Sequence, residues 1–144
     1  MTSHTSLKDD LPKIRKLSEW LTQAGYSEKI EGEYSVSFTK DAISVTVSYG
    51  RHSDLADVFV TIDDQRADRY ANGKAYRYSI FEFALVDGGQ LFVDRRNDYE
   101  TTKIGLDLLR SNSRFFEMDF LKGIRTRYLE LLEKRLPKNL KNLG

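Results

Sequence analysis

The segment from residue 65 to residue 78, QRADRYANGKAYRY, has the composition that is most suggestive of chemistry, because basic residues alternate with tyrosines. Cations contact phosphates and aromatic rings stack on bases, so this mixture can hold single-stranded nucleic acid. Tyr and Arg are also the residues that dominate protein–protein hot spots. We rank first a hairpin whose tyrosines pack on the domain while its arginines reach solvent, then a protein contact, then a nucleic-acid contact. The candidate nucleic-acid-binding residues are Arg66, Arg69, Tyr70, Lys74, Tyr76 and Arg77.

A second candidate site consists of aspartates near the two ends of a strand that we expect over residues 56–63. These carboxylates suit a basic protein partner. Complementary charge speeds association and selects the partner. The chain carries a net charge of +1, but residues 122–144 carry +5, so residues 1–121 carry −4. That excess repels a polyanion at long range, which favours protein over nucleic acid as the partner. The candidate protein-binding residues are Asp54, Asp57, Asp63 and Asp64.

Motifs of catalysis are scarce in this sequence. There is no cysteine, which excludes disulfides and thiolate chemistry. The phosphate-binding loop, the dinucleotide fingerprint and the nucleophile elbow are all absent. A metal contact would need His52 with Asp54 and Asp57, and we rank a surface turn above it because two or three ligands in one turn are weak evidence. We therefore expect a non-enzymatic protein that needs no cofactor.

The elements that must position these residues are organised around a hairpin over residues 33–49. Apolar and polar residues alternate there with the period of a half-buried strand. If Lys40 and Asp41 form the turn, opposite residues have numbers that add to 81, and Val36 then lies across from Val45. A slip of one residue would turn one apolar set to solvent. The opposite face is polar, and a partner, another subunit or an uncommitted helix can cover it. Its residues are Ser35, Ser37, Thr39, Ser44 and Thr46.

Spacing patterns predict the remaining elements. Residues 7–24 have the periodicity of an amphipathic helix that Gly25 ends. A third strand is expected over 56–63, with Val58, Val60 and Ile62 inward, and short strands over 74–78 and 91–93. For residues 79–86 we prefer a short helix, begun by a capping box of Ser79 and Glu82, to a strand.

Two helices close the chain. The first is expected to begin at Thr101 or Thr102, with Ile104, Leu108 and Leu109 as its apolar residues. Residues 111–113 interrupt it, and Pro137 ends the second. The prediction is an α+β fold: an antiparallel sheet of three to five strands, with an N-terminal helix, a short middle helix and two C-terminal helices packed mainly on one face. We expect one domain over residues 1–144, with mobile ends at 1–6 and 138–144.

The expected location is the cytoplasm, with no membrane contact. No apolar run approaches the ~20 residues that span a bilayer. The first residues lack the apolar core of a signal peptide, and the absence of cysteine fits a reducing compartment.

The sequence from Tyr49 to Val58, YGRHSDLADV, carries a resemblance. A strand that ends in an aromatic residue is followed by Arg-x-Ser-Asp and then by Asp-Val at the start of another strand. This arrangement resembles small uncharacterised bacterial α+β proteins, some of which are immunity proteins encoded beside polymorphic toxins. The resemblance implies a protein that binds and occludes a cognate bacterial toxin, and it carries over no binding residues.

Overall fold

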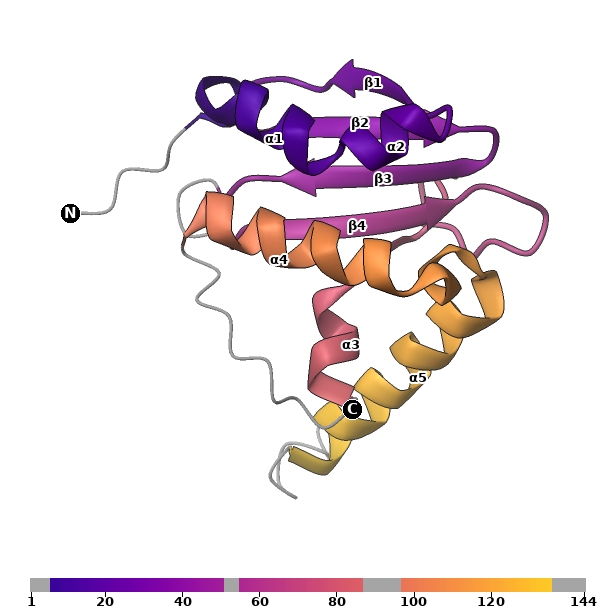
Figure 1. Ribbon diagram of the computed structural model, residues 1–144. Helices are drawn as coiled ribbons and strands as arrows, with labels where there is room; N and C mark the ends of the chain where they lie inside the picture. The colour runs from indigo at the N-terminus through magenta and orange to yellow at the C-terminus, as the bar shows by residue number, and fades with distance from the viewer. Residues whose placement is uncertain (1–5, 51–54, 87–96, 136–144) are drawn as a thin grey trace.

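The structure is a computed structural model that describes residues 6–50, 55–86 and 97–135 (Figure 1). Its sheet has five antiparallel strands whose spatial order, β1-β2-β3-β4-β5, follows the chain. The strands are β1 Ser27–Ile30, β2 Ser35–Lys40, β3 Ile43–Ser48, β4 Asp57–Ile62 and β5 Arg77–Ser79. The helical elements are η1 Leu7–Asp10, α1 Leu11–Leu17, α2 Glu19–Gln23, α3 Phe81–Val86, α4 Asp98–Ser111, η2 Ser113–Phe116 and α5 Met118–Arg135. The predicted α+β class, with an antiparallel sheet, an N-terminal helical segment, a short middle helix and two C-terminal helices, is confirmed, whereas β1 is not among the predicted strands.

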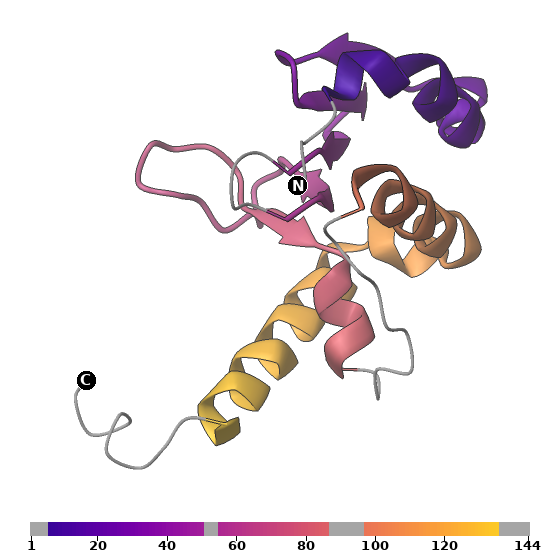
Figure 2. The same cartoon turned by 90° about the vertical axis from the view of Figure 1, so that its left-hand side faces the viewer.

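The helices divide into two groups. Helices α1, α2 and α4 cover one face of the sheet, while α3 and α5 pack on each other and extend beyond the β4–β5 side (Figures 1 and 2). The covered face presents fully buried side chains from the central strands: Val36, Phe38, Val45, Val47, Val58 and Val60. None of the helices in the described part of the chain has the length and apolarity that crossing a bilayer requires.

The hairpin register differs from the prediction by two residues. Val36 lies opposite Val47, and Lys40 lies opposite Ile43, so the turn residues are Asp41 and Ala42. Asp41 has a φ of 54°, a conformation that Asp accepts more readily than Lys does, which explains why the turn is shifted. A shift of two keeps every side chain on its predicted face.

The N-terminal helix is less continuous than its periodicity predicts. It is divided into η1, α1 and α2, and Ser18 separates α1 from α2 with a non-helical backbone. The buried Ser18 hydroxyl donates to the Ile14 carbonyl oxygen at 2.7 Å. Gly25, at a φ of 99°, ends the segment as expected. Trp20 is half-buried and packs edge-on against Phe116.

Residues 81–86 form the short helix that we prefer to a strand. Ser79 belongs to β5, and its hydroxyl accepts the Phe81 N–H at 3.3 Å. The Glu82 carboxylate accepts from Arg125 instead of returning to Ser79, so the reciprocal half of the capping box is not formed. The expected edge strand over 74–78 is observed at Arg77–Ser79, and the strand expected over 91–93 lies outside the described residues.

Helix α4 begins earlier than Thr101, because the Asn97 side chain accepts the Glu100 N–H at 3.0 Å and caps the helix. Ile104 and Leu108, two of the three residues expected on its apolar side, are only half-buried. Its buried residues include Thr101, Thr102, Gly105, Leu106 and Leu109. The buried side of the helix therefore combines small and polar residues with two leucines, and Gly105 lies against β4.

Gly105 sets the close approach between α4 and β4. A Cβ at this position would lie 2.6 Å from Val58 Cγ2 and 3.3 Å from Ile80 Cδ1. The 2.6 Å contact puts the overpacking cost in the upper part of the usual range of about 1–3 kcal/mol, and the helix-propensity gain offsets about 1 kcal/mol of it. We therefore expect Gly105→Ala to lower the free energy of unfolding by about 1–2 kcal/mol. Thermal unfolding followed by circular dichroism measures the change.

Gly123→Ala in α5 is the matched control. A Cβ there would meet none of the described atoms within 4 Å, so only the propensity gain remains. We expect this variant to melt at a higher temperature than the unmodified protein. If both alanine variants gain stability, the α4–β4 contact is looser than the structure shows.

Candidate functional site

The second face of the sheet carries no helix in the described part of the chain (Figure 2). Strand alternation that turns apolar residues toward α1 and α4 necessarily turns the intervening residues to this side, which we call the open face. The central strands supply it with hydroxyls: Ser37, Thr39, Ser44, Thr46 and Thr61. The open face is therefore the candidate site.

A pocket of about 320 Å³ lies on the open face. The five hydroxyl residues form its floor. Tyr70 and Lys74, from the connection between β4 and β5, stand beside Arg77 on one side, and Glu31 lies on the β1 side. The pocket thus crosses the strands and combines hydroxyls with charges of both signs.

The floor hydroxyls are paired across the strands. Ser37 Oγ lies 3.1 Å from Thr46 Oγ1, and Thr39 Oγ1 lies 2.9 Å from Ser44 Oγ. Ser37 and Thr46 are only 5% and 6% exposed, although no helix covers them. Each pair uses one of its two hydroxyl hydrogens, so one hydrogen per pair is left to donate to a ligand.

The 63–76 loop, the connection between β4 and β5, is held by ion pairs between the two sets of predicted site residues. Arg69 donates to Asp63 Oδ1 at 2.8 Å and to the Gly73 carbonyl oxygen at 3.0 Å. Arg66 pairs with Asp64 at 3.5 Å. Residues that we assigned to competing acidic and basic sites therefore neutralise each other.

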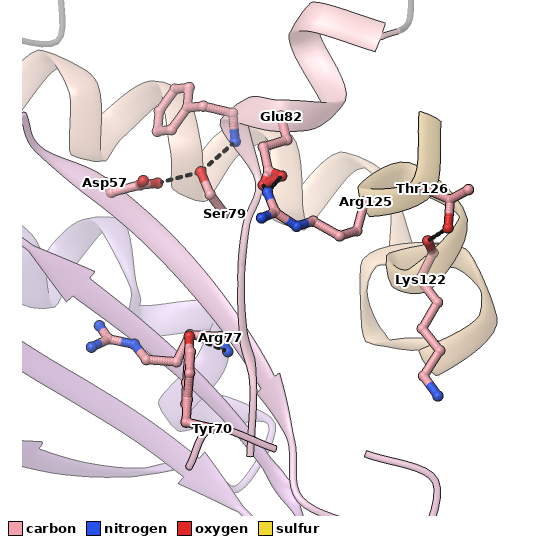
Figure 3. A network of polar contacts seen from close by, with 9 residues as sticks. Asp57, Tyr70, Arg77, Ser79, Glu82, Lys122, Arg125 and Thr126 are labelled. Atoms are coloured by element: carbon pink, nitrogen blue, oxygen red, sulfur yellow. Dashed lines mark hydrogen bonds and ion pairs between the residues drawn. The ribbon is translucent and has the colours of Figure 1, made fainter. Parts of the chain in front are cut away.

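The tyrosines of the segment pack on the domain, in agreement with our preferred interpretation. Tyr76 lies between Tyr70 and Tyr78, at centroid distances of 5.1 and 4.9 Å. Tyr78 is 5% exposed, and burial raises its pKa to about 12. The Tyr70 hydroxyl oxygen accepts the Arg77 N–H at 3.2 Å (Figure 3). Tyr70, at 41% exposure, is the most accessible of these rings.

The loop is also anchored to α5. Lys122 donates to the Arg66 carbonyl oxygen at 2.6 Å and lies 3.9 Å from Asp68. Nearby, Arg125 of α5 pairs with Glu82 of α3 at 2.6 Å (Figure 3). These contacts join residues more than 40 positions apart, and no local pattern in the sequence indicates them. The two contacts of Lys122 hold the loop against α5, and the Arg125–Glu82 pair joins α5 to α3.

The predicted acidic residues do not form one surface. Asp57 is buried, and its Oδ1 accepts the Val58 N–H at 2.7 Å. The same oxygen accepts the Ser79 hydroxyl at 2.8 Å (Figure 3). It ties the start of β4 to β5, whereas Asp63 and Asp64 follow the opposite end of β4. Asp54 lies outside the described residues. Asp57 is therefore placed to stabilise the sheet, not to meet a partner.

The first residues of the Tyr49–Val58 motif connect the sheet to two helical elements. The buried Tyr49 hydroxyl donates to Asp10 Oδ2 at 2.7 Å, and burial raises the pKa of Tyr49. The Gly50 N–H donates to Asp98 Oδ1 at 2.9 Å. The proposed His52 metal contact lies outside the described residues, and the described residues contain no group of three or more metal-ligating side chains.

Comparison with known proteins found no protein-family model, no curated protein and no solved structure that matches this chain.

Proposed function

We propose that this chain is a non-enzymatic protein-binding domain that uses the open face of its sheet. The observation that carries the proposal is the hydroxyl-floored pocket with the anchored 63–76 loop as its wall. A fixed wall lowers the entropy cost of binding, because the loop is already ordered. Hydroxyls and charges of both signs suit the polar and charged groups of a protein surface.

The dimensions of the open face indicate what an interface must include. Five strands spaced by ~4.8 Å span roughly 19 Å, and six residues along a strand span roughly 20 Å, which gives a projected area of about 400 Å². Stable interfaces bury about 800 Å² on each partner. The partner must therefore also contact the 63–76 loop or a neighbouring edge of the sheet.

A cognate bacterial toxin is the partner class that we propose, with occlusion in the cytoplasm as the mode of action. This proposal is supported by the Tyr49–Val58 motif, which resembles that of small bacterial α+β proteins, some of which are toxin immunity proteins. Occlusion needs no catalytic residues on this chain. It needs only a complementary surface held rigidly, and the ion pairs of the 63–76 loop supply that rigidity.

The test is a titration with the product of an adjacent toxin gene, followed by isothermal calorimetry. Thr61→Arg places a large cation on the pocket floor, and we expect it to weaken binding at least 10-fold. Thr22→Arg makes the same substitution at an exposed position on α2, behind the sheet, and we expect unchanged affinity. Equal affinities of the two variants would place the interface elsewhere, and failure of any adjacent toxin to bind would reject the toxin as partner.

The alternative role, a nucleic-acid-binding module built on residues 65–78, makes a different prediction. Binding to single-stranded RNA or DNA should then be micromolar or tighter at physiological salt. It should disappear when the four basic residues of the segment are mutated, namely Arg66, Arg69, Lys74 and Arg77. The observed ion pairs of Arg66 and Arg69 with aspartates argue against it, because a phosphate would have to displace a carboxylate. Such binding in a mobility-shift assay would contradict the protein-binding proposal.

A further inference from the structure

We propose that the pocket on the open face receives an acidic side chain of the protein partner, held between Lys74 and Arg77. This inference rests on the proposed protein-binding function and specifies the chemistry of the bound group. Four features of the pocket support it: the uncompensated charges of one wall, the orientation of a stacked guanidinium, the polarity across the sheet and the hydroxyl floor.

The β5 side of the pocket carries a net positive charge after the charges that are paired within the protein are subtracted. Asp63 lines the pocket, but Arg69 pairs with it at 2.8 Å. Lys74 is exposed and has no ion-pair partner among the described residues. Arg77 is exposed as well and likewise pairs with no carboxylate in the described part of the chain. The two charges left for a ligand on this wall are therefore both cationic.

Arg77 is oriented by an aromatic ring of the open face. Its guanidinium carbon lies 4.2 Å from the centroid of the Phe59 ring. Stacking occupies one face of the guanidinium plane and leaves the N–H groups at its edge available. A carboxylate can accept two of these parallel N–H groups, the geometry in which Arg–carboxylate pairs are strongest.

The opposite end of the pocket has the opposite charge. Glu31 lies on the β1 side, at the opposite edge of the sheet from β5. Glu31 has no ion-pair partner among the described residues. The polarity gives a bound segment a direction, with its acidic group near β5 and any basic group near β1.

Between the two ends, the floor offers hydrogen-bond donors. The Ser37–Thr46 and Thr39–Ser44 pairs each keep one unused hydroxyl hydrogen. Acceptor groups of a bound segment that lie over β2 and β3 can take these hydrogens. An acidic side chain beside Lys74 and Arg77 thus finds two cations and the hydroxyl of Thr61, which lies opposite Arg77 on β4, whereas a basic side chain at that end meets two like charges.

The experiment is selection of a random 12-residue peptide library displayed on phage against the intact protein. We expect the selected peptides to be enriched in Asp and Glu over the unselected library. A synthetic peptide of the selected sequence should bind the Lys74→Glu/Arg77→Glu variant at least 10-fold more weakly than the unmodified protein. Its addition should shift the backbone amide resonances of Ser37, Thr46 and Thr61.

The Lys103→Glu/Arg110→Glu variant is the matched control, since it makes the same change in net charge at exposed positions on α4. Its affinity for the peptide should equal that of the unmodified protein, and thermal unfolding shows that both variants are folded. Enrichment of basic residues, enrichment of no sequence, or equal weakening in both variants would overturn the inference. Tighter binding of a single-stranded oligonucleotide than of the peptide to the same residues would overturn it as well.

Failure of this inference is distinguishable from failure of the proposed function. If Thr61→Arg weakens toxin binding while the charge-reversed variant does not, the open face binds protein but does not bind an acidic anchor. If neither variant affects toxin binding, both proposals are rejected.

Discussion

Replacing Val45 with aspartate should lower the free energy of unfolding by more than about 4 kcal/mol and leave little folded protein at room temperature. Val45 is at the centre of β3 with no exposed surface, opposite Phe38 on β2 and Val60 on β4, which are equally buried. A carboxylate there would be surrounded by apolar atoms, with neither water nor a hydrogen-bond donor at hand. Urea denaturation followed by far-ultraviolet circular dichroism measures the loss.

Ser44→Asp is the control, because it places the same carboxylate one residue earlier on the same strand. Ser44 points to the open face, is only half-buried, and pairs with Thr39 across the strands. Water can reach a carboxylate at that position, so we expect a loss below about 1 kcal/mol. Comparable losses in the two variants would show that the assignment of the covered and open faces is wrong.

The face assignment was accessible from the sequence because it depends only on a period of two. Val36, Val45 and Val47 alternate with polar residues, and that pattern determines which side of each strand is buried, whatever the turn is. The register was not accessible in the same way. It depends on the turn, and the left-handed conformation of Asp41 moves the turn by one residue and the pairing by two.

Strand β1 is an element that the pattern of apolar residues does not predict. Its sequence, Ser-Glu-Lys-Ile, has no alternation, and three of its four residues are exposed. It is held by backbone pairing to β2 and by Arg15, whose guanidinium donates to Glu28 at 2.9 and 3.0 Å. An edge strand that buries few side chains does not require an alternating apolar sequence. β1 therefore forms because of its contacts with β2 and Arg15, which its own sequence does not reveal.

The residues that form the candidate site could be predicted from the sequence, but their arrangement in space could not. The Ser/Thr face of the hairpin and the basic, tyrosine-rich segment are both visible in the sequence. That Asp63 and Arg69 neutralise each other, and that Lys122 holds the loop from 56 residues away, depends on the tertiary structure. Counting charges along the chain therefore overestimated both the acidic and the basic sites, because a charge that is paired internally is not offered to a partner.

The ion pair between Glu82 and Arg125 leads to the second large effect that we expect. It joins α3 to α5 at 2.6 Å, and the Glu82 side chain is 12% exposed while that of Arg125 is 32% exposed. Arg125 also lies over the rings of Tyr76 and Tyr128, at 5.4 and 5.6 Å. Burial raises the pKa of Glu82 above its ordinary value of 4.5, and the hydrogen bond from Arg125 opposes that rise only in part.

Arg125→Met should lower the free energy of unfolding at pH 7 by about 2–3 kcal/mol. Removing one partner of a fully buried pair costs about 3–5 kcal/mol, and the solvent exposure of Arg125 reduces that cost. The unpaired Glu82 carboxylate would remain largely buried, which is why the arginine is the more damaging partner to remove. Urea denaturation at pH 7 measures the loss. The exposed Arg15–Glu28 pair supplies a control, since Arg15→Met should change stability far less.

The pH dependence separates loss of charge pairing from loss of packing. Without Arg125, the pKa of folded Glu82 should rise further, while the unfolded chain titrates near the ordinary value of 4.5. A group whose pKa is raised on folding favours the folded state at low pH and loses that contribution as the pH rises through the folded pKa. The deficit of Arg125→Met should therefore be complete at pH 7 and shrink as the pH falls toward 4.5.

Glu82→Gln combined with Arg125→Met should recover most of the stability at pH 7, because no charge is then left unpaired. A deficit that is independent of pH and persists in the double variant would mean that Arg125 acts through packing on Tyr76 and Tyr128 alone.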